Sequence, residues 1–185
     1  MSNKILLVDD ETNIRRSYKR SLYGQFNLET AASGQEGLAL LADEGPFAVV
    51  ISDMRMPVMN GIQFLTEVKA MFPDTVRMML TGNADLQTVL NAVNKGYLFR
   101  FLVKPCSLAD MTEALTTGLE QYRLRTAERD VLEKTLKGSI ELLTDVLNQL
   151  NPVAFKRTVR LRTIVQKLVS HLKLEDAWQY ELAAM

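Results

Sequence analysis

The chain has 185 residues, of which 47% are hydrophobic, so it has room for one packed domain of ~120–150 residues and a further segment. This composition excludes a disordered protein, and 22 basic residues balance 22 acidic ones. A net charge of zero gives no general reason to expect nucleic acid or an anionic membrane as a partner. The single cysteine, Cys106, excludes an internal disulfide and fits a reducing compartment.

No segment has the pattern of a targeting or membrane-spanning sequence. The first residues lead directly into a short apolar run without a signal-peptide pattern. No apolar run approaches the ~20 residues that a helix needs to cross a bilayer. We therefore expect a soluble, cytoplasmic protein.

Short apolar runs alternate with segments of helical periodicity along the first 120 residues. In chain order, the expected strands are 4–8, 26–31, 47–52, 76–80 and 98–103, and the expected helices are 12–23, 34–43, 62–72, 86–93 and one that begins near 107. Because right-handed crossovers place such helices on both faces of a parallel sheet, the sequence predicts an α/β, doubly wound, five-stranded parallel sheet.

Polar residues follow four of these strands. They are Asp9 and Asp10 after the first, Asp53 after the third, Thr81 after the fourth and Lys104 after the fifth. Parallel strands end at one edge, where open α/β sheets bind ligands. Carboxylates held close together repel unless a cation joins them, and Mg²⁺ suits this set because it uses few carboxylates together with water and phosphate oxygens. One carboxylate could then attack a phosphoryl group while the cation and Lys104 neutralise the developing charge. Taken singly, Asp53 and Thr81 would more often be cap or turn residues and Lys104 a solvated charge.

Four stretches carry a resemblance to a known family: ILLVDDE at 5–11, ISDMRMPVMNG at 51–61, LTGN at 80–83 and LVKP at 102–105. In this order and spacing, residues 4–120 resemble the receiver domain of bacterial two-component response regulators. The resemblance implies a CheY-like, flavodoxin-like sheet of order 2-1-3-4-5 in a receiver domain of residues 1–122. It also implies a phosphoprotein whose partner is a sensor histidine kinase.

The resemblance implies a role for each site residue. Asp53 would be the phosphoacceptor. Asp10, Asp53 and the backbone carbonyl of Arg55 would bind Mg²⁺ directly, and Asp9 would bind it through water. Thr81 and Lys104 would contact the phosphoryl oxygens.

Two further positions depend on the resemblance. The Lys104–Pro105 peptide bond would be cis. Phe101 stands where the family places its switch aromatic, often a tyrosine. Because a phenylalanine cannot donate a hydrogen bond, this switch would depend on packing alone; the alternative is that Phe101 is simply a core residue.

The helix that begins near 107 shows a seven-residue repeat typical of a coiled coil. The repeat contains Leu108, Leu115, Tyr122, Leu136, Leu143 and Leu150, with Leu119, Ile140 and Leu147 at the second seam position. A continuous helix over 107–150 would be about 65 Å long, and two helices broken near 125–130 or at Gly138 are the alternative. A second copy of the chain would satisfy the seam as a parallel homodimer; packing against residues 153–185 is the competing explanation.

We expect residues 151–185 to form a helical tail, which looks like the start of a truncated output domain. Asn151 and Pro152 end one helix and begin another, and residues 153–173 carry basic residues without an acidic one until Glu175. The tail weakly resembles the opening helices of HD-type output domains. Such a site needs paired His and Asp metal ligands, but this chain has only His171 and no such pair.

The sequence therefore favours a response regulator of a two-component phosphorelay that is not itself an enzyme. One alternative is a DNA-binding regulator that acts through the basic helix 153–173, although we do not expect nucleic acid as a partner. The other is an aspartyl-phosphate phosphatase of the same fold. That reading is disfavoured because no insertion at a strand end could build a substrate pocket.

Overall fold

The computed structural model describes residues 3–82, 98–150, 164–165, 167–169 and 171. The chain divides into two compact units, Met1–Thr126 and Ala127–Met185. The helix expected at 86–93 and most of the tail lie outside the described residues.

The first unit is a parallel α/β sheet. Its elements are β1 (Lys4–Val8), α1 (Thr12–Ser21), β2 (Asn27–Ala31), α2 (Gly34–Glu44), β3 (Val49–Asp53), α3 (Gly61–Met71), β4 (Val76–Thr81), β5 (Arg100–Val103) and α5 (Leu108–Leu150). All neighbouring strands pair in parallel, in the order β2-β1-β3-β4-β5. The predicted fold class and strand order are confirmed, and the described elements begin and end within two residues of the predicted bounds.

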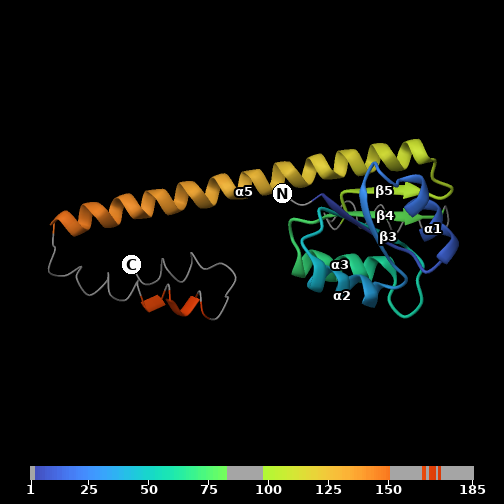
Figure 1. Cartoon of the computed structure of the whole chain (residues 1–185), viewed down its shortest axis with the longest axis horizontal. Coiled ribbons are helices and arrows are strands. Elements are labelled where there is room, and N and C mark those ends of the chain that lie inside the picture. Colours follow the sequence, from blue (N-terminus) through green and yellow to red (C-terminus); the bar gives the residue numbers. More distant parts are fainter. Residues whose placement is uncertain (1–2, 83–97, 151–163, 166, 170, 172–185) are drawn as a thin grey trace. The chain divides into compact units, whose positions relative to one another are not determined.

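The side chains of the strands alternate between two hydrophobic cores, one on each face of the sheet. Ile5, Val49 and Met78 pack with α5, whereas Leu6 and Val50 pack with α2 and α3. Figure 1 shows α2 and α3 on one face of the sheet and α5 on the other. Every residue of β3 is buried, as expected for the central strand of a sheet covered on both faces.

The start of α3 is fixed tightly against the end of β3. The side chain of Asn60 accepts a hydrogen bond from the Gln63 amide, and the Gln63 side chain accepts one from the Asn60 amide, which makes a capping box. The amide of Gly61 donates to the carbonyl oxygen of Met54 at 3.0 Å. A Cβ at position 61 would lie 2.1 Å from the carbonyl oxygen of Asp53. Only glycine therefore allows α3 to begin this close to Asp53.

The last helix is continuous over its 43 residues, which confirms the unbroken alternative. The structure corrects the first half of the predicted seam, because Leu115 and Tyr122 are buried in the core of the first unit and Leu119 packs against it. Thr126 is also buried, and its hydroxyl donates to the carbonyl oxygen of Tyr122 at 2.9 Å. Leu115, Leu119 and Tyr122 therefore pack inside their own domain and are not available to a second copy, whereas Leu108 at the start of the repeat is 45% exposed.

The second unit contains the rest of α5 and the described part of the tail. Six large apolar side chains described in this part of α5 are exposed: Val131, Leu132, Leu136, Leu142, Leu143 and Val146. Four of them, Leu132, Leu136, Leu143 and Val146, follow the spacing of a heptad repeat, and we call these four the distal stripe. Of the residues described in this unit, only Val169 is buried. None of the helices in the described ranges combines the length and the apolar character that a bilayer crossing needs.

Candidate functional site

The main-chain hydrogen bonds of the sheet continue past the strand ends and fix the residues that follow. Three amides donate to a carbonyl oxygen of the neighbouring strand: Asp9 to Ala31 at 3.2 Å, Met54 to Leu80 at 2.9 Å and Lys104 to Thr81 at 2.8 Å. The polar residues at this edge are therefore attached to a rigid sheet rather than to free loops.

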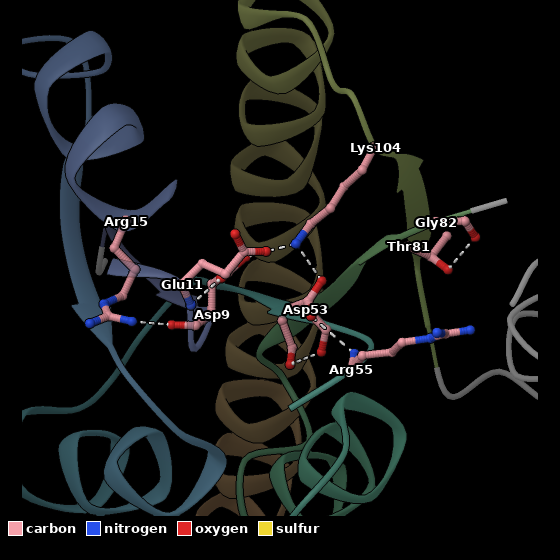
Figure 2. Close-up of polar contacts among 9 residues, drawn as sticks. Asp9, Glu11, Arg15, Asp53, Arg55, Thr81, Gly82 and Lys104 are labelled. Atoms are coloured by element: carbon pink, nitrogen blue, oxygen red, sulfur yellow. Dashed lines mark hydrogen bonds and ion pairs between the residues drawn. The ribbon is translucent and has the colours of Figure 1, made fainter. Parts of the chain in front are cut away.

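The side chain of Lys104 joins two of the predicted carboxylates. Its Nζ lies 2.6 Å from Oδ1 of Asp53 and 2.9 Å from Oδ2 of Asp9 (Figure 2). Asp9 is fully buried and Asp53 is 7% exposed. Burial works against the charged form of Lys104, but its hydrogen bonds to Asp53 and Asp9 outweigh this, so the pKa of Lys104 is raised. The structure thus brings together three of the residues that the sequence singled out.

The other carboxylate oxygens of this pair accept main-chain hydrogen bonds. The amide of Glu11 donates to Oδ1 of Asp9 at 2.8 Å, and the amide of Arg55 donates to Oδ2 of Asp53 at 3.0 Å. Both carboxylates are therefore held on two sides before any ligand arrives.

The remaining predicted residues lie at the same edge with less direct contacts. Thr81 is fully buried at the end of β4, and its hydroxyl donates to the carbonyl oxygen of Gly82 at 3.1 Å. Asp10 is exposed directly after Asp9. Phe101 is half-buried against the core on the α2 and α3 face, and the Lys104–Pro105 peptide bond is cis.

The sequence did not single out Arg15, which also reaches this site. In the first turn of α1, its guanidinium donates to the carbonyl oxygen of Asp9 and, at 3.1 Å, to Oγ1 of Thr12. In the sequence, the one feature that could have pointed to Arg15 is its place as a basic residue one turn into the helix that follows Asp9 and Asp10.

The donor set at the edge suits a hard divalent cation. In the described part of the chain, no three His, Cys, Asp or Glu side chains lie close enough together to hold a metal ion. The set expected from the sequence needs fewer, because it has two direct carboxylates and a main-chain carbonyl, with water for the rest. Its ligands are all oxygen atoms, and the buried carboxylates of Asp9 and Asp53 share one ammonium group. Oxygen ligands with excess negative charge fit Mg²⁺ better than a softer metal.

The chain belongs to the response regulator receiver domain family, whose family model matches residues 5–116. Receiver domains are in general signalling domains of two-component systems. Sensor kinases phosphorylate these domains, which generally bind Mg²⁺ at their acidic site.

Relatives extend this match beyond the receiver domain. The hydrogenase transcriptional regulatory protein HoxA of Cupriavidus necator is 35% identical over 161 residues, which cover 85% of this chain and 31% of HoxA. The response regulator protein PilR of Pseudomonas aeruginosa is 34% identical and is covered over 34% of its length, with 82% of this chain aligned. The chain thus spans about a third of the length of these relatives.

Solved structures share the fold over the first unit. A structure described as an adenylate cyclase from Rhodopirellula baltica is 42% identical, with a TM-score of 0.71, over 72% of this chain and 99% of that chain. The signal receiver domain of an HD domain-containing protein from Pseudomonas fluorescens Pf-5 is 31% identical, with a TM-score of 0.61, over 66% of this chain and 98% of that chain.

Proposed function

We propose that this chain accepts a phosphoryl group on Asp53 from a sensor histidine kinase, with Mg²⁺, and relays the change through α5 to an output domain or partner. The observation that carries the proposal is the contact of Lys104 with both Asp53 and Asp9 at the carboxyl edge of the sheet. A carboxylate with a fixed ammonium beside it is arranged for attack on phosphorus and for neutralising the charge that develops.

In the proposed transfer, a carboxylate oxygen of Asp53 forms a bond to phosphorus as the bond from phosphorus to the kinase imidazole breaks. The imidazole nitrogen keeps the bonding electron pair and is protonated. Lys104 and the hydroxyl of Thr81 contact the phosphoryl oxygens, for which Thr81 turns away from Gly82. Asp10, Asp53 and the carbonyl oxygen of Arg55 would hold the Mg²⁺ directly, with Asp9 bound through water. The bound ion supplies charge neutralisation for the phosphoryl oxygens.

The proposed switch depends on packing around Phe101. When Lys104 and Thr81 turn toward the phosphoryl group, the ends of β4 and β5 would adjust. Phe101 lies on β5 and is half-buried against the core on the α2 and α3 face. Its half-buried ring gives it room to change position without a hydrogen bond. A single-charge change at Asp53 would in this way become a packing change in the domain.

We also propose that the chain forms a homodimer through α5, now limited to the part after Thr126. The distal stripe repeats at intervals of three, four and seven residues, as a coiled-coil seam requires. Its four apolar side chains are 47% to 63% exposed in a single chain. A second copy of the same helix offers them matching side chains.

The receiver does not fix the output, because the family occurs in proteins named as transcriptional regulators, as an adenylate cyclase and as an HD domain-containing protein. The HD-like tail and the basic helix 153–173 lie mostly outside the described residues. Of the two alternatives, DNA binding draws some support from relatives named as transcriptional regulators, and a salt-dependent shift of duplex DNA would test it. Turnover of a generic phosphomonoester would instead support a phosphatase.

Phosphorylation is tested with a small phosphoryl donor and intact-mass measurement. Acetyl phosphate with Mg²⁺ should add one phosphoryl group to the wild-type chain, and hydroxylamine should remove it, as it does from acyl phosphates. Asp53→Ala should gain none, whereas Asp43→Ala, which changes an exposed carboxylate at the end of α2, should be modified like the wild type. A hydroxylamine-sensitive adduct of equal yield on Asp53→Ala would refute the assignment of Asp53.

A further inference from the structure

Arg15 holds the main chain at the point where the two neighbouring carboxylates Asp9 and Asp10 follow β1. Its Nη1 donates to the carbonyl oxygen of Asp9, and its Nη2 donates to Oγ1 of Thr12 at 3.1 Å. Figure 2 shows the side chain reaching from α1 across to Asp9. A guanidinium that donates through two nitrogens is fixed in direction as well as in position.

The bonded carbonyl belongs to the peptide group that links Asp9 to Asp10. Fixing this oxygen restricts the rotation of that peptide plane, and the plane sets the direction in which the next residue leaves the strand. The side chain of Asp9 is already fixed, since Glu11 and Lys104 bind its two oxygens at 2.8 and 2.9 Å. Arg15 adds the main-chain restraint that the side-chain contacts cannot supply.

We propose that Arg15 is a positioning residue for cation binding: it orients the Asp9–Asp10 peptide so that the Asp10 carboxylate reaches the divalent cation beside Asp53. This inference rests on the proposed function, because it needs Mg²⁺ to bind at this edge. The inference gives α1 a role in the site, in addition to the residues at the ends of the strands.

The direction of the change in Mg²⁺ affinity distinguishes a positioning role of Arg15 from a purely electrostatic effect of its charge. A cation near a Mg²⁺ site repels the ion, so removing Arg15 should tighten Mg²⁺ binding if charge alone matters. If Arg15 orients Asp10, its removal should weaken binding, because a preorganised ligand becomes free to rotate. Residues that orient metal ligands typically contribute ~10–100-fold to affinity.

The test is a Mg²⁺ titration of the full-length chain by calorimetry, without any phosphoryl donor. Arg15→Ala should bind Mg²⁺ about tenfold more weakly than wild type, and Thr12→Val should show a smaller loss because it frees one end of the guanidinium. Arg16→Ala is the matched control, since Arg16 is an exposed arginine of the same helix. It should leave the affinity unchanged or slightly tighter. Far-UV circular dichroism verifies that each variant is folded at the titration temperature.

A double-mutant cycle with Asp10→Asn tests the route of the effect. If Arg15 acts through Asp10, adding Arg15→Ala to Asp10→Asn should weaken binding little further. Equal or tighter Mg²⁺ binding by Arg15→Ala would overturn the inference, as would an undiminished loss in the Asp10→Asn background. A wild-type chain that binds no Mg²⁺ would instead overturn the proposed function itself.

Discussion

The Nζ of Lys104 lies 2.6 Å from Oδ1 of Asp53, although β4 separates β3, which ends at Asp53, from β5, which Lys104 follows. The same ammonium lies 2.9 Å from Asp9 at the end of β1. One cation thereby links the ends of β1, β3 and β5 across the edge of the sheet. The contact matters for stability as well as for the proposed chemistry, because both carboxylates are buried.

Replacing Lys104 with methionine should destabilise the domain when no divalent cation is present. The change keeps an unbranched side chain but leaves two buried carboxylates without their shared counter-ion. Removing one partner of a buried ion pair costs about 3–5 kcal/mol, and the partial exposure of Lys104 places the expected loss near 2–3 kcal/mol. Urea unfolding at pH 7 measures it.

Lys19→Met is the control for this prediction. Lys19 forms an exposed ion pair with Glu29 at 3.4 Å, so its loss should change the free energy of unfolding by less than about 1 kcal/mol. Equal effects of the two substitutions would show that the Lys104 contacts contribute no more than a surface pair.

Stability should decrease as the pH rises above about 9. Burial raises the pKa of Cys106 above its ordinary 9.0 and that of Tyr18 above 10.0. Burial opposes the charge on Lys104, but hydrogen bonds to Asp53 and Asp9 raise its pKa above 10.5. The folded state therefore holds these protons longer than the unfolded state, and stability falls with pH.

Each group contributes in its own pH window. The contribution of Lys104 is complete below pH 10.5 and is lost as the pH passes its folded-state pKa. Urea unfolding of the wild type from pH 7 to 11 should show the decrease. Cys106→Ser should make the decrease in stability smaller at the lower end of this pH range, and Lys104→Met should make it smaller at the upper end. A free energy of unfolding that stays constant from pH 8 to 11 would contradict the prediction.

Gly61→Ala should disturb the site more than its size suggests. The added Cβ would lie 2.1 Å from the carbonyl oxygen of Asp53, which is main chain and has no flexible end to move. We expect a loss of stability of about 2–4 kcal/mol and a lower yield of the acetyl phosphate adduct. Thermal unfolding and intact mass measure the two effects.

Gly138→Ala provides the comparison for Gly61. A Cβ at position 138 meets nothing within 4 Å, and alanine is favoured over glycine inside a helix by about 0.5–1 kcal/mol. This variant should keep the full adduct yield and gain helix stability. Comparable losses for both alanine variants would show that crowding at Asp53 is not the cause.

Val58 is held in a strained turn close to the site. Its φ is 68°, and the amide of Met59 donates across it to the carbonyl oxygen of Pro57 at 2.7 Å. Positive φ in a three-residue turn is rare for a side chain with a Cβ, and more so for a branched one. Val58 is 88% exposed, so it loses little packing on replacement. Val58→Gly should therefore stabilise the domain by about 1 kcal/mol in thermal or urea unfolding.

Val58→Ala serves as the comparison, because it removes the branching but keeps the Cβ. It should recover only part of the gain. A destabilised Val58→Gly would mean that the exposed valine contributes packing that outweighs its strain.

Lysine substitutions in the distal stripe should convert the proposed dimer into monomers. The wild type should show about twice its 20.9 kDa mass in light scattering, and Leu136→Lys with Leu143→Lys should show the single mass. Both side chains are exposed in one chain, at 49% and 61%, so the substitution leaves no cavity.

Leu142→Lys is the control for the stripe. Leu142 is 67% exposed on the same helix but lies outside the repeat, so this variant should keep the wild-type mass. A wild type that remains a monomer with and without Mg²⁺ and beryllofluoride would contradict the proposed dimer. It would indicate that another part of the same chain covers the distal stripe.

Local patterns in the sequence were enough to predict the alternation of strands and helices and the convergence of Asp9, Asp53, Thr81 and Lys104. Apolar runs and helical periodicity depend on local geometry, and a parallel sheet places all its strand ends at one edge. These features need no knowledge of distances.

The three-dimensional arrangement was needed to establish which groups meet at that edge and what covers each apolar face. That Lys104 binds both carboxylates, and that Arg15 holds the Asp9 carbonyl, depends on where long side chains end in space. The repeat in α5 marked Leu115 and Tyr122 as buried, but the sheet of the same domain covers them. A periodic pattern indicates that one face of a helix is buried. It does not indicate whether the chain itself or a second copy covers that face.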